Sequence, residues 1–169
     1  MPSVTARLAR YRVRLGFLAA IAAFVLARPT VTSVAWGAAV AALGEALRFW
    51  AAGHLEKGRE VTASGPYRLT RHPLYVGSSI MGVGFAVASA SAAAAALVGI
   101  YLLLTIGAAI RSEESHLTEK FGRAYPEYRE GRSAIAPRRF SLARAWQNRE
   151  YRSLAGVLAA LALLLWKAL

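Results

Sequence analysis

Two polar clusters hold the side chains of this chain that are best suited to chemistry. The first occupies residues 64–77, at the mouth of an apolar run that begins at Leu74. The second occupies residues 111–117 and begins where the same run ends, at Ile110. If that run folds into a helical hairpin, both clusters come to one membrane face. Histidine, glutamate and tyrosine can transfer protons and arginine binds anions, so the pair is a candidate reaction site.

The first cluster favours an anionic group. Pro73 suits the first position of a helix, because its fixed φ and missing N–H are tolerated there. His72 and Tyr75 can then point to the same side. The free amides of a helix N-terminus carry a partial positive charge, to which Arg68 and Arg71 add full charges. This end of the helix therefore suits a carboxylate or a phosphate.

The second cluster favours a cation. Glu113 and Glu114 are adjacent carboxylates that can hold an ammonium or a sulfonium group. The two clusters together suit a zwitterion. S-adenosylmethionine carries a carboxylate, an ammonium, a sulfonium and an aromatic base, so it fits the helix N-terminus, the glutamates and the tyrosines. These residue types alone do not select it over other zwitterions.

Other chemistries have weaker support. The potential metal ligands show no H-E-x-x-H spacing, so no metal is predicted; they are His54, His72, His116, Glu113 and Glu114. Cysteine is absent, which excludes disulfides and thiolate sites. No G-x-S-x-G elbow accompanies the serines, so a serine nucleophile is not predicted either.

The elements that position these clusters are membrane helices. The chain has 169 residues, of which 56% are hydrophobic. The apolar residues form blocks at 15–27, 31–50, 74–110 and 154–169. Because about 20 residues cross a membrane once, the third block should fold back, with its tip at residues 89–91. We predict an all-α polytopic membrane protein of about five transmembrane helices, in which the third and fourth form a hairpin.

The basic residues predict the orientation. All 21 lysines and arginines lie within residues 7–14, 48–71 and 111–152, except Arg28 and Lys167. The positive-inside rule then puts the N-terminus and both clusters in the cytoplasm and the C-terminus outside. This topology accounts for the net charge of +12 without nucleic acid, and anionic lipid headgroups are the expected partner.

The remaining segments carry structural predictions. Residues 1–14 should lie along the cytoplasmic interface, before the first helix enters the bilayer, and the basic segment 132–152 is assigned no chemistry. Apolar side chains recur at helical spacing from Leu117 to Tyr128, but Gly122 and Pro126 interrupt them. The helix should therefore bend near Phe121 and fold back over the cytoplasmic mouth. Glu45 and Arg48 form either a local ion pair or part of the site.

Several motifs resemble the isoprenylcysteine carboxyl methyltransferase family of integral membrane enzymes, and are similar to phosphatidylethanolamine methyltransferases. The matching residues extend over about 43–137 and are Leu47-Arg48, Gly65-Pro66-Tyr67, Arg71-His72-Pro73-Leu74-Tyr75-Val76-Gly77, Glu113-Glu114, Leu117, Phe121-Gly122, Tyr125, Tyr128 and Pro137. The resemblance implies S-adenosylmethionine as cofactor in a cytoplasmic pocket. Its cofactor-binding positions correspond here to Val61, Thr62, Tyr67, His72, Pro73, Leu74, Tyr75 and Glu113.

The resemblance implies methyl transfer to a lipophilic or small acceptor, either a prenylcysteine-like carboxylate or a lipid amine or thiol. The family's substrate-binding arginine corresponds to Ala109 here, and the nearest arginine is Arg111. Arg111 or Arg71 would orient an anionic acceptor. Glu114 would accept the proton of an amine or thiol, a role open also to Glu113, His72 and His116.

Two alternatives stay open, a nicotinamide-dependent reductase of the membrane sterol type and a membrane interaction protein without activity. The chain is predicted to be a single membrane domain over 1–169, with two helices in 1–52, the motif-bearing core in 53–137 and a basic segment with the last helix in 138–169. A bacterial inner membrane is the expected location.

Overall fold

The computed structural model describes residues 4–132 and 138–169, with side chains from Leu15 onward. The described residues form helices and no strands, as the all-α prediction requires. The helices are α1 Val4–Leu26, α2 Val31–Ala52, the 3-10 turn η1 Gly65–Arg68, α3 Pro73–Ser89, α4 Ala92–Phe121, α5 Ala124–Arg129, α6 Leu142–Gln147 and α7 Tyr151–Ala168.

The turns between the long helices follow the local signals of the sequence. Thr30 caps α2: its hydroxyl accepts from the amide of Ser33 at 3.0 Å. The predicted tip of the hairpin is confirmed, because α3 ends at Ser89, its C-cap Ala90 has φ of 45° and Ser91 caps α4. Pro73 is the first residue of α3, as predicted.

The ends of two helices bear on further predictions. α1 begins at Val4, so residues 4–14 belong to the first helix, and their position at the interface stays a prediction. Arginine and alanine, which make up six of the eleven residues 4–14, are strong helix formers. α4 ends at Phe121 and α5 follows after Gly122, which confirms the predicted bend. Pro137, the last residue of the motif region, lies outside the described residues.

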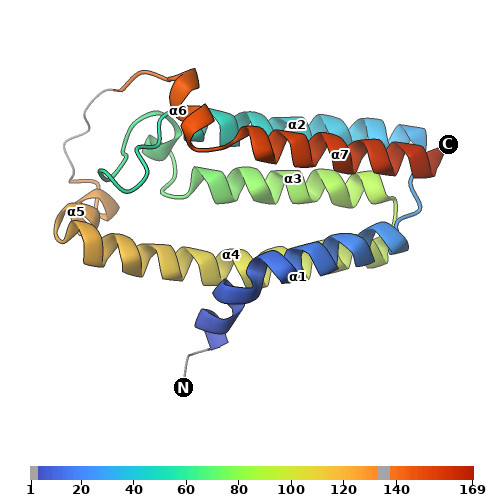
Figure 1. Ribbon diagram of the computed structural model, residues 1–169, viewed down its shortest axis with the longest axis horizontal. Helices are drawn as coiled ribbons and strands as arrows, with labels where there is room; N and C mark the ends of the chain where they lie inside the picture. Colours follow the sequence, from blue (N-terminus) through green and yellow to red (C-terminus); the bar gives the residue numbers. More distant parts are fainter. Residues whose placement is uncertain (1–3, 133–137) are drawn as a thin grey trace.

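The long helices pack side by side with α3 in the middle (Figure 1). α3 lies between α2 and α4, while α7 packs on α2 and α1 on α4. The α2–α3 contact is close because glycines face it: a Cβ on Gly44 would come within 2.6 Å of the carbonyl oxygen of Gly77. One end of the bundle carries η1, α5, α6 and the loop after α2, and the opposite end carries the short turns and the C-terminus (Figure 1).

The surface of the bundle is apolar, as expected of a protein in lipid. Phe17, Trp36, Leu103 and Trp166 are each more than two thirds exposed. Within the described residues, α4 and α7 are long and apolar enough to cross a membrane, and residues 15–26 and 73–89 form shorter apolar helices. The count of five spans therefore stays a prediction.

Candidate active site

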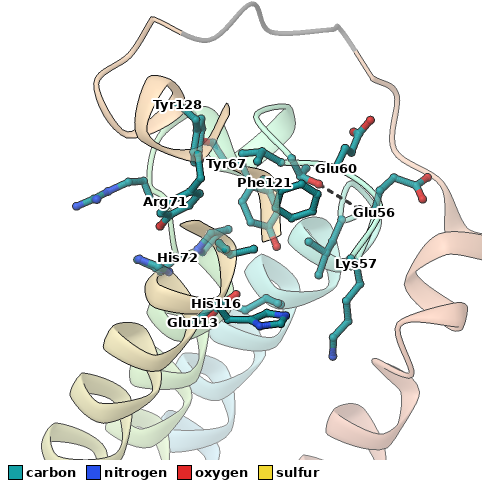
Figure 2. Close-up of a pocket in the computed structure, with 18 of the residues that line it drawn as sticks. Glu56, Lys57, Glu60, Tyr67, Arg71, His72, Glu113, His116, Phe121 and Tyr128 are labelled. Atoms are coloured by element: carbon teal, nitrogen blue, oxygen red, sulfur yellow. Dashed lines mark hydrogen bonds between the residues drawn. The ribbon is translucent and has the colours of Figure 1, made fainter. Parts of the chain in front are cut away.

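A cavity of about 630 Å³ opens at the end of the bundle that carries the polar loops. Its walls come from the C-terminal part of α2, the loop 55–62, η1, the start of α3, the end of α4, and α5. In Figure 2, Arg71, His72 and Tyr128 lie on one side of the cavity and Glu56 and Lys57 on the other. The cavity is formed where the two polar clusters meet.

The cavity brings together all the positions for which the resemblance implied cofactor binding. They come from three separate segments and include the start of α3. All eight line the cavity: Val61, Thr62, Tyr67, His72, Pro73, Leu74, Tyr75 and Glu113. Their role as cofactor ligands stays a prediction, but they share one cavity as that role requires.

Glu114 joins the start of α3 to α4 and α5. Its Oε1 accepts from the Arg71 guanidinium at 3.0 Å and from the Tyr125 hydroxyl at 3.3 Å, and lies 3.2 Å from Nε2 of His72. The His72 contact is a hydrogen bond when Nε2 carries a proton. Glu114 does not line the cavity, so its contacts stabilise the walls.

Glu113 and His116 are placed differently from Glu114. Both line the cavity, and they lie three residues apart on one face of α4, at the base of the cavity in the view of Figure 2. Neither has a hydrogen bond or ion pair to a side chain within residues 15–132 and 138–169. These two side chains are therefore free to contact a ligand.

The two arginines predicted to orient an acceptor differ in position. Arg71 lines the cavity, whereas Arg111 is exposed and is not among the lining residues. Ala109 lines the cavity at the position of the family's arginine. Arg48 of α2 also lines it and was not predicted there with the cofactor motif. The sequence signal for Arg48 was its pairing with Glu45 within an apolar block, which left open that the pair belongs to the site.

Tyrosines close the cavity on the side of α5. The Tyr128 hydroxyl donates to the carbonyl oxygen of Tyr67 at 2.6 Å, which fixes α5 against η1. Burial and the nearby Glu114 raise the pKa of Tyr125 to about 12. Burial and then Glu113 raise the pKa of Tyr67, and burial raises that of Tyr128. All three hydroxyls therefore stay protonated, and those of Tyr125 and Tyr128 act as donors.

The segment around α6 holds the loop after α2. Arg144 donates to the carbonyl oxygen of Gly53 at 2.6 Å, and its Nε lies 2.9 Å from Glu56. Arg138 lies 2.7 Å from Glu60, and the Asn148 amide donates to the carbonyl oxygens of Ala52 and Leu55. No chemistry was predicted for 132–152, yet these contacts shape one wall of the cavity.

A second cavity, of about 490 Å³, lies between α1, α3, α4 and α7. Its walls are almost entirely apolar and include Phe17, Phe85 and Leu102. Ser78 also lines it and accepts a 2.6 Å hydrogen bond from Arg48, which lines the polar cavity. One hydrogen-bonded pair thus stands between the two cavities.

The candidate metal ligands do not gather. Within the described part of the chain, no three histidine or glutamate side chains are grouped so that they could hold a metal ion. His54 is buried beside Trp50 and Phe140, away from the glutamates of α4.

Comparison with known proteins gives a family and two curated relatives. Residues 15–124 match the phospholipid methyltransferase family. The chain is 33% identical over 93 residues to the nickel-cobalt-cadmium resistance protein NccN of Alcaligenes xylosoxydans xylosoxydans, which covers 54% of the chain and 43% of the relative. It is 32% identical over 104 residues to the cobalt-zinc-cadmium resistance protein CzcN of Cupriavidus metallidurans, which covers 60% and 46% respectively. The chain thus spans less than half the length of these relatives. No solved structure matches it.

Proposed function

The chain belongs to the phospholipid methyltransferase family, and on this premise we propose that it transfers a methyl group from S-adenosylmethionine to a lipophilic or small acceptor. The acceptor is a prenylcysteine-like carboxylate or a lipid amine or thiol. The observation that carries the proposal is the shared cavity, in which all the positions implied to bind the cofactor meet.

The chemistry of the cavity fits S-adenosylmethionine. A volume of about 630 Å³ lies within the usual range for small-molecule sites, roughly 300–1,000 Å³. Glu113 suits the ammonium or the sulfonium, and the start of α3 with Arg71 suits the carboxylate. Tyr67 and Phe121 supply aromatic faces for the base.

The residues of the cavity have distinct tasks in this reaction. S-adenosylmethionine, when bound, supplies a methyl group: its S–CH₃ bond breaks as a bond to the acceptor forms, and S-adenosylhomocysteine remains. The chain aligns the two reactants and excludes water. An amine or thiol acceptor also gives up a proton, which a carboxylate oxygen of Glu113 or a ring nitrogen of His116 can accept. A carboxylate acceptor needs no base.

The apolar cavity supports a lipophilic acceptor. It lies within the part of the bundle that we expect in the membrane, where an alkyl chain can enter from the lipid. The Arg48–Ser78 pair connects it to the polar cavity. An acceptor with its tail in one cavity and its polar head in the other would reach the cofactor.

The polar cavity is proposed to face the cytoplasm of a bacterial inner membrane, with the C-terminus outside. The basic side chains at that end of the bundle support this orientation and suit anionic lipid headgroups. Cytoplasmic S-adenosylmethionine would then enter directly.

Calorimetry of the detergent-purified protein with S-adenosylhomocysteine tests the proposal. We expect saturable binding that Glu113→Gln weakens at least about tenfold. Glu119→Gln, an exposed residue of α4 outside the cavity, is the matched control and should bind like the wild type. Binding of NADPH without S-adenosylhomocysteine would instead identify a reductase, and binding of neither by folded protein would favour an interaction protein.

A further inference from the structure

Arg48 of α2 contacts two other helices of the bundle. Its Nε lies 2.7 Å from Oε1 of Glu150, the residue that precedes α7, in an ion pair that lacks the geometry of a hydrogen bond. Its NH1 donates to Ser78 Oγ at 2.6 Å and to the carbonyl oxygen of Leu74 at 3.3 Å, both on α3. The Arg48 side chain is 20% exposed and that of Glu150 is 6% exposed. One guanidinium therefore ties three helices together.

Arg48 faces a second carboxylate. Glu45 Oε2 lies 3.9 Å from Nε of Arg48 and accepts from the Ser153 hydroxyl of α7 at 2.7 Å. Glu45 Oε1 is buried and has no hydrogen-bond partner within the described residues. Desolvation makes buried ion pairs a weak source of stability, so stability alone does not account for three such charges.

One contact of Arg48 is with Leu74, a residue of the motif that is implied to bind the cofactor. Leu74 is in the first turn of α3 and lines the polar cavity. His72, the N-cap of α3, makes no side-chain hydrogen bond to that turn. The Arg48 guanidinium therefore fixes the first turn of α3 through its hydrogen bond to the Leu74 carbonyl oxygen.

The backbone conformation before α7 positions Glu150. Asn148 fixes the corner between α6 and α7, because its amide donates to Ala52 at the end of α2 and to Leu55 in the loop that follows. Arg149 follows with φ of 61°, a left-handed conformation that is unfavourable for a non-glycine residue. The next residue is Glu150, which the corner brings against Arg48.

We propose that Glu150 is a positioning residue: it orients Arg48, which in turn holds the first turn of α3 in the geometry that binds the cofactor. This inference rests on the proposed function, because it takes the cavity to bind S-adenosylmethionine. It also assigns a role to the last helix, since Glu150 lies beyond residues 15–124 of the family match.

The test measures S-adenosylhomocysteine affinity by calorimetry together with thermal melting of the full-length protein in detergent. Glu150→Gln keeps the shape of the side chain and removes its charge, and we expect it to weaken binding about tenfold. Arg48→Gln should weaken binding to a similar degree. The double variant should be no weaker than the single ones, because both act through one contact.

Two controls separate positioning from a general effect on the fold. Ser153→Ala removes a contact of Glu45 but not of Glu150, and should leave the affinity within about twofold of the wild type. Glu150→Asp keeps the carboxylate and should recover part of the affinity. Where Glu150→Gln does not fold, Glu150→Asp and Arg48→Lys carry the same comparison.

The outcomes are distinct. Unchanged affinity in Glu150→Gln with a lowered melting temperature would show a structural role only and overturn the inference, while Glu113→Gln still reports on the cofactor site. Additive losses in the double variant would also overturn it. Absence of binding in the wild type would reject the proposed function itself, and the inference with it.

Discussion

The guanidinium of Arg71 lies 3.0 Å from the carboxylate of Glu114, and this contact joins the two polar clusters across the hairpin. The partners are 43 residues apart in the sequence. His72 and Tyr125 meet the same carboxylate oxygen, so Glu114 fixes the start of α3, the end of α4 and α5 relative to one another. Its neighbour Glu113 lines the cavity. Adjacent residues thus have different tasks.

We expect Glu114→Gln and Glu113→Gln to separate stability from binding. Glu114→Gln removes the negative charge that contacts Arg71 and His72. It should lower the free energy of unfolding by only about 1 kcal/mol, because these side chains are partly exposed to solvent. Glu113→Gln should leave the melting temperature unchanged and weaken S-adenosylhomocysteine binding. Thermal melting and calorimetry on both variants check this. Equal loss of stability in the two would contradict it.

Tyr128→Phe should speed the release of the cofactor. The variant loses the hydrogen bond to the Tyr67 carbonyl that fixes α5 beside the cavity, worth about 1 kcal/mol. S-adenosylhomocysteine should then dissociate about fivefold faster, as measured by stopped-flow displacement. Tyr151→Phe, which removes a hydroxyl outside the cavity, is the control. An unchanged dissociation rate in Tyr128→Phe would show that α5 does not retain the ligand.

Gly44→Ala should destabilise the bundle. The new methyl would come within 2.6 Å of the Gly77 carbonyl oxygen, so α2 and α3 would have to move apart. We expect a loss of about 2 kcal/mol, of the size usual for overpacking. Gly99→Ala is the matched control, because nothing lies within 4 Å of its added methyl. The melting temperatures of both variants are measured. An equal decrease in the two would refute the close contact.

The protein should lose stability at alkaline pH. Tyr125 has a pKa of about 12 in the fold, against about 10 in an unfolded chain. A raised pKa stabilises the fold while the hydroxyl stays protonated. That contribution is complete below about pH 10 and disappears as the pH rises toward 12. Melting temperatures across this range should fall more steeply for the wild type than for Tyr125→Phe, and parallel curves would argue against it.

Local signals in the sequence were enough to place the α3–α4 hairpin and much of the cavity. Pro73 and the 89–91 tip are short-range stop and start signals, and the structure has helix ends at both. The length of the 74–110 block required a hairpin, and that hairpin brings Glu113 beside His72 and Tyr75. The motif positions therefore meet in one cavity even though they are far apart in sequence.

Local signals in the sequence could not predict contacts between distant segments. Glu150 is the only acid between residues 131 and 169, which hints at a buried partner, but nothing in its neighbourhood points to Arg48. Arg111 shows a different limit. A helix turns by roughly 100° per residue, so Arg111 can be exposed while Ser112 and Ala109 line the cavity. Proximity in sequence does not place a side chain on the right face.

Filling the apolar cavity should impair the acceptor and spare the cofactor. Ala160 of α7 lines that cavity, and Ala160→Phe would occupy part of its volume of about 490 Å³. Methyl transfer from S-adenosylmethionine is assayed with dodecylamine, dodecanethiol and dodecanoate, which share one tail and differ in the head. We expect the KM of the accepted probe to rise about tenfold, with S-adenosylhomocysteine affinity unchanged. Ala159→Phe, an exposed neighbour outside the cavity, should behave like the wild type. An unchanged KM in Ala160→Phe would exclude this cavity as the site of the tail, and no turnover of any probe would count against a long-chain acceptor.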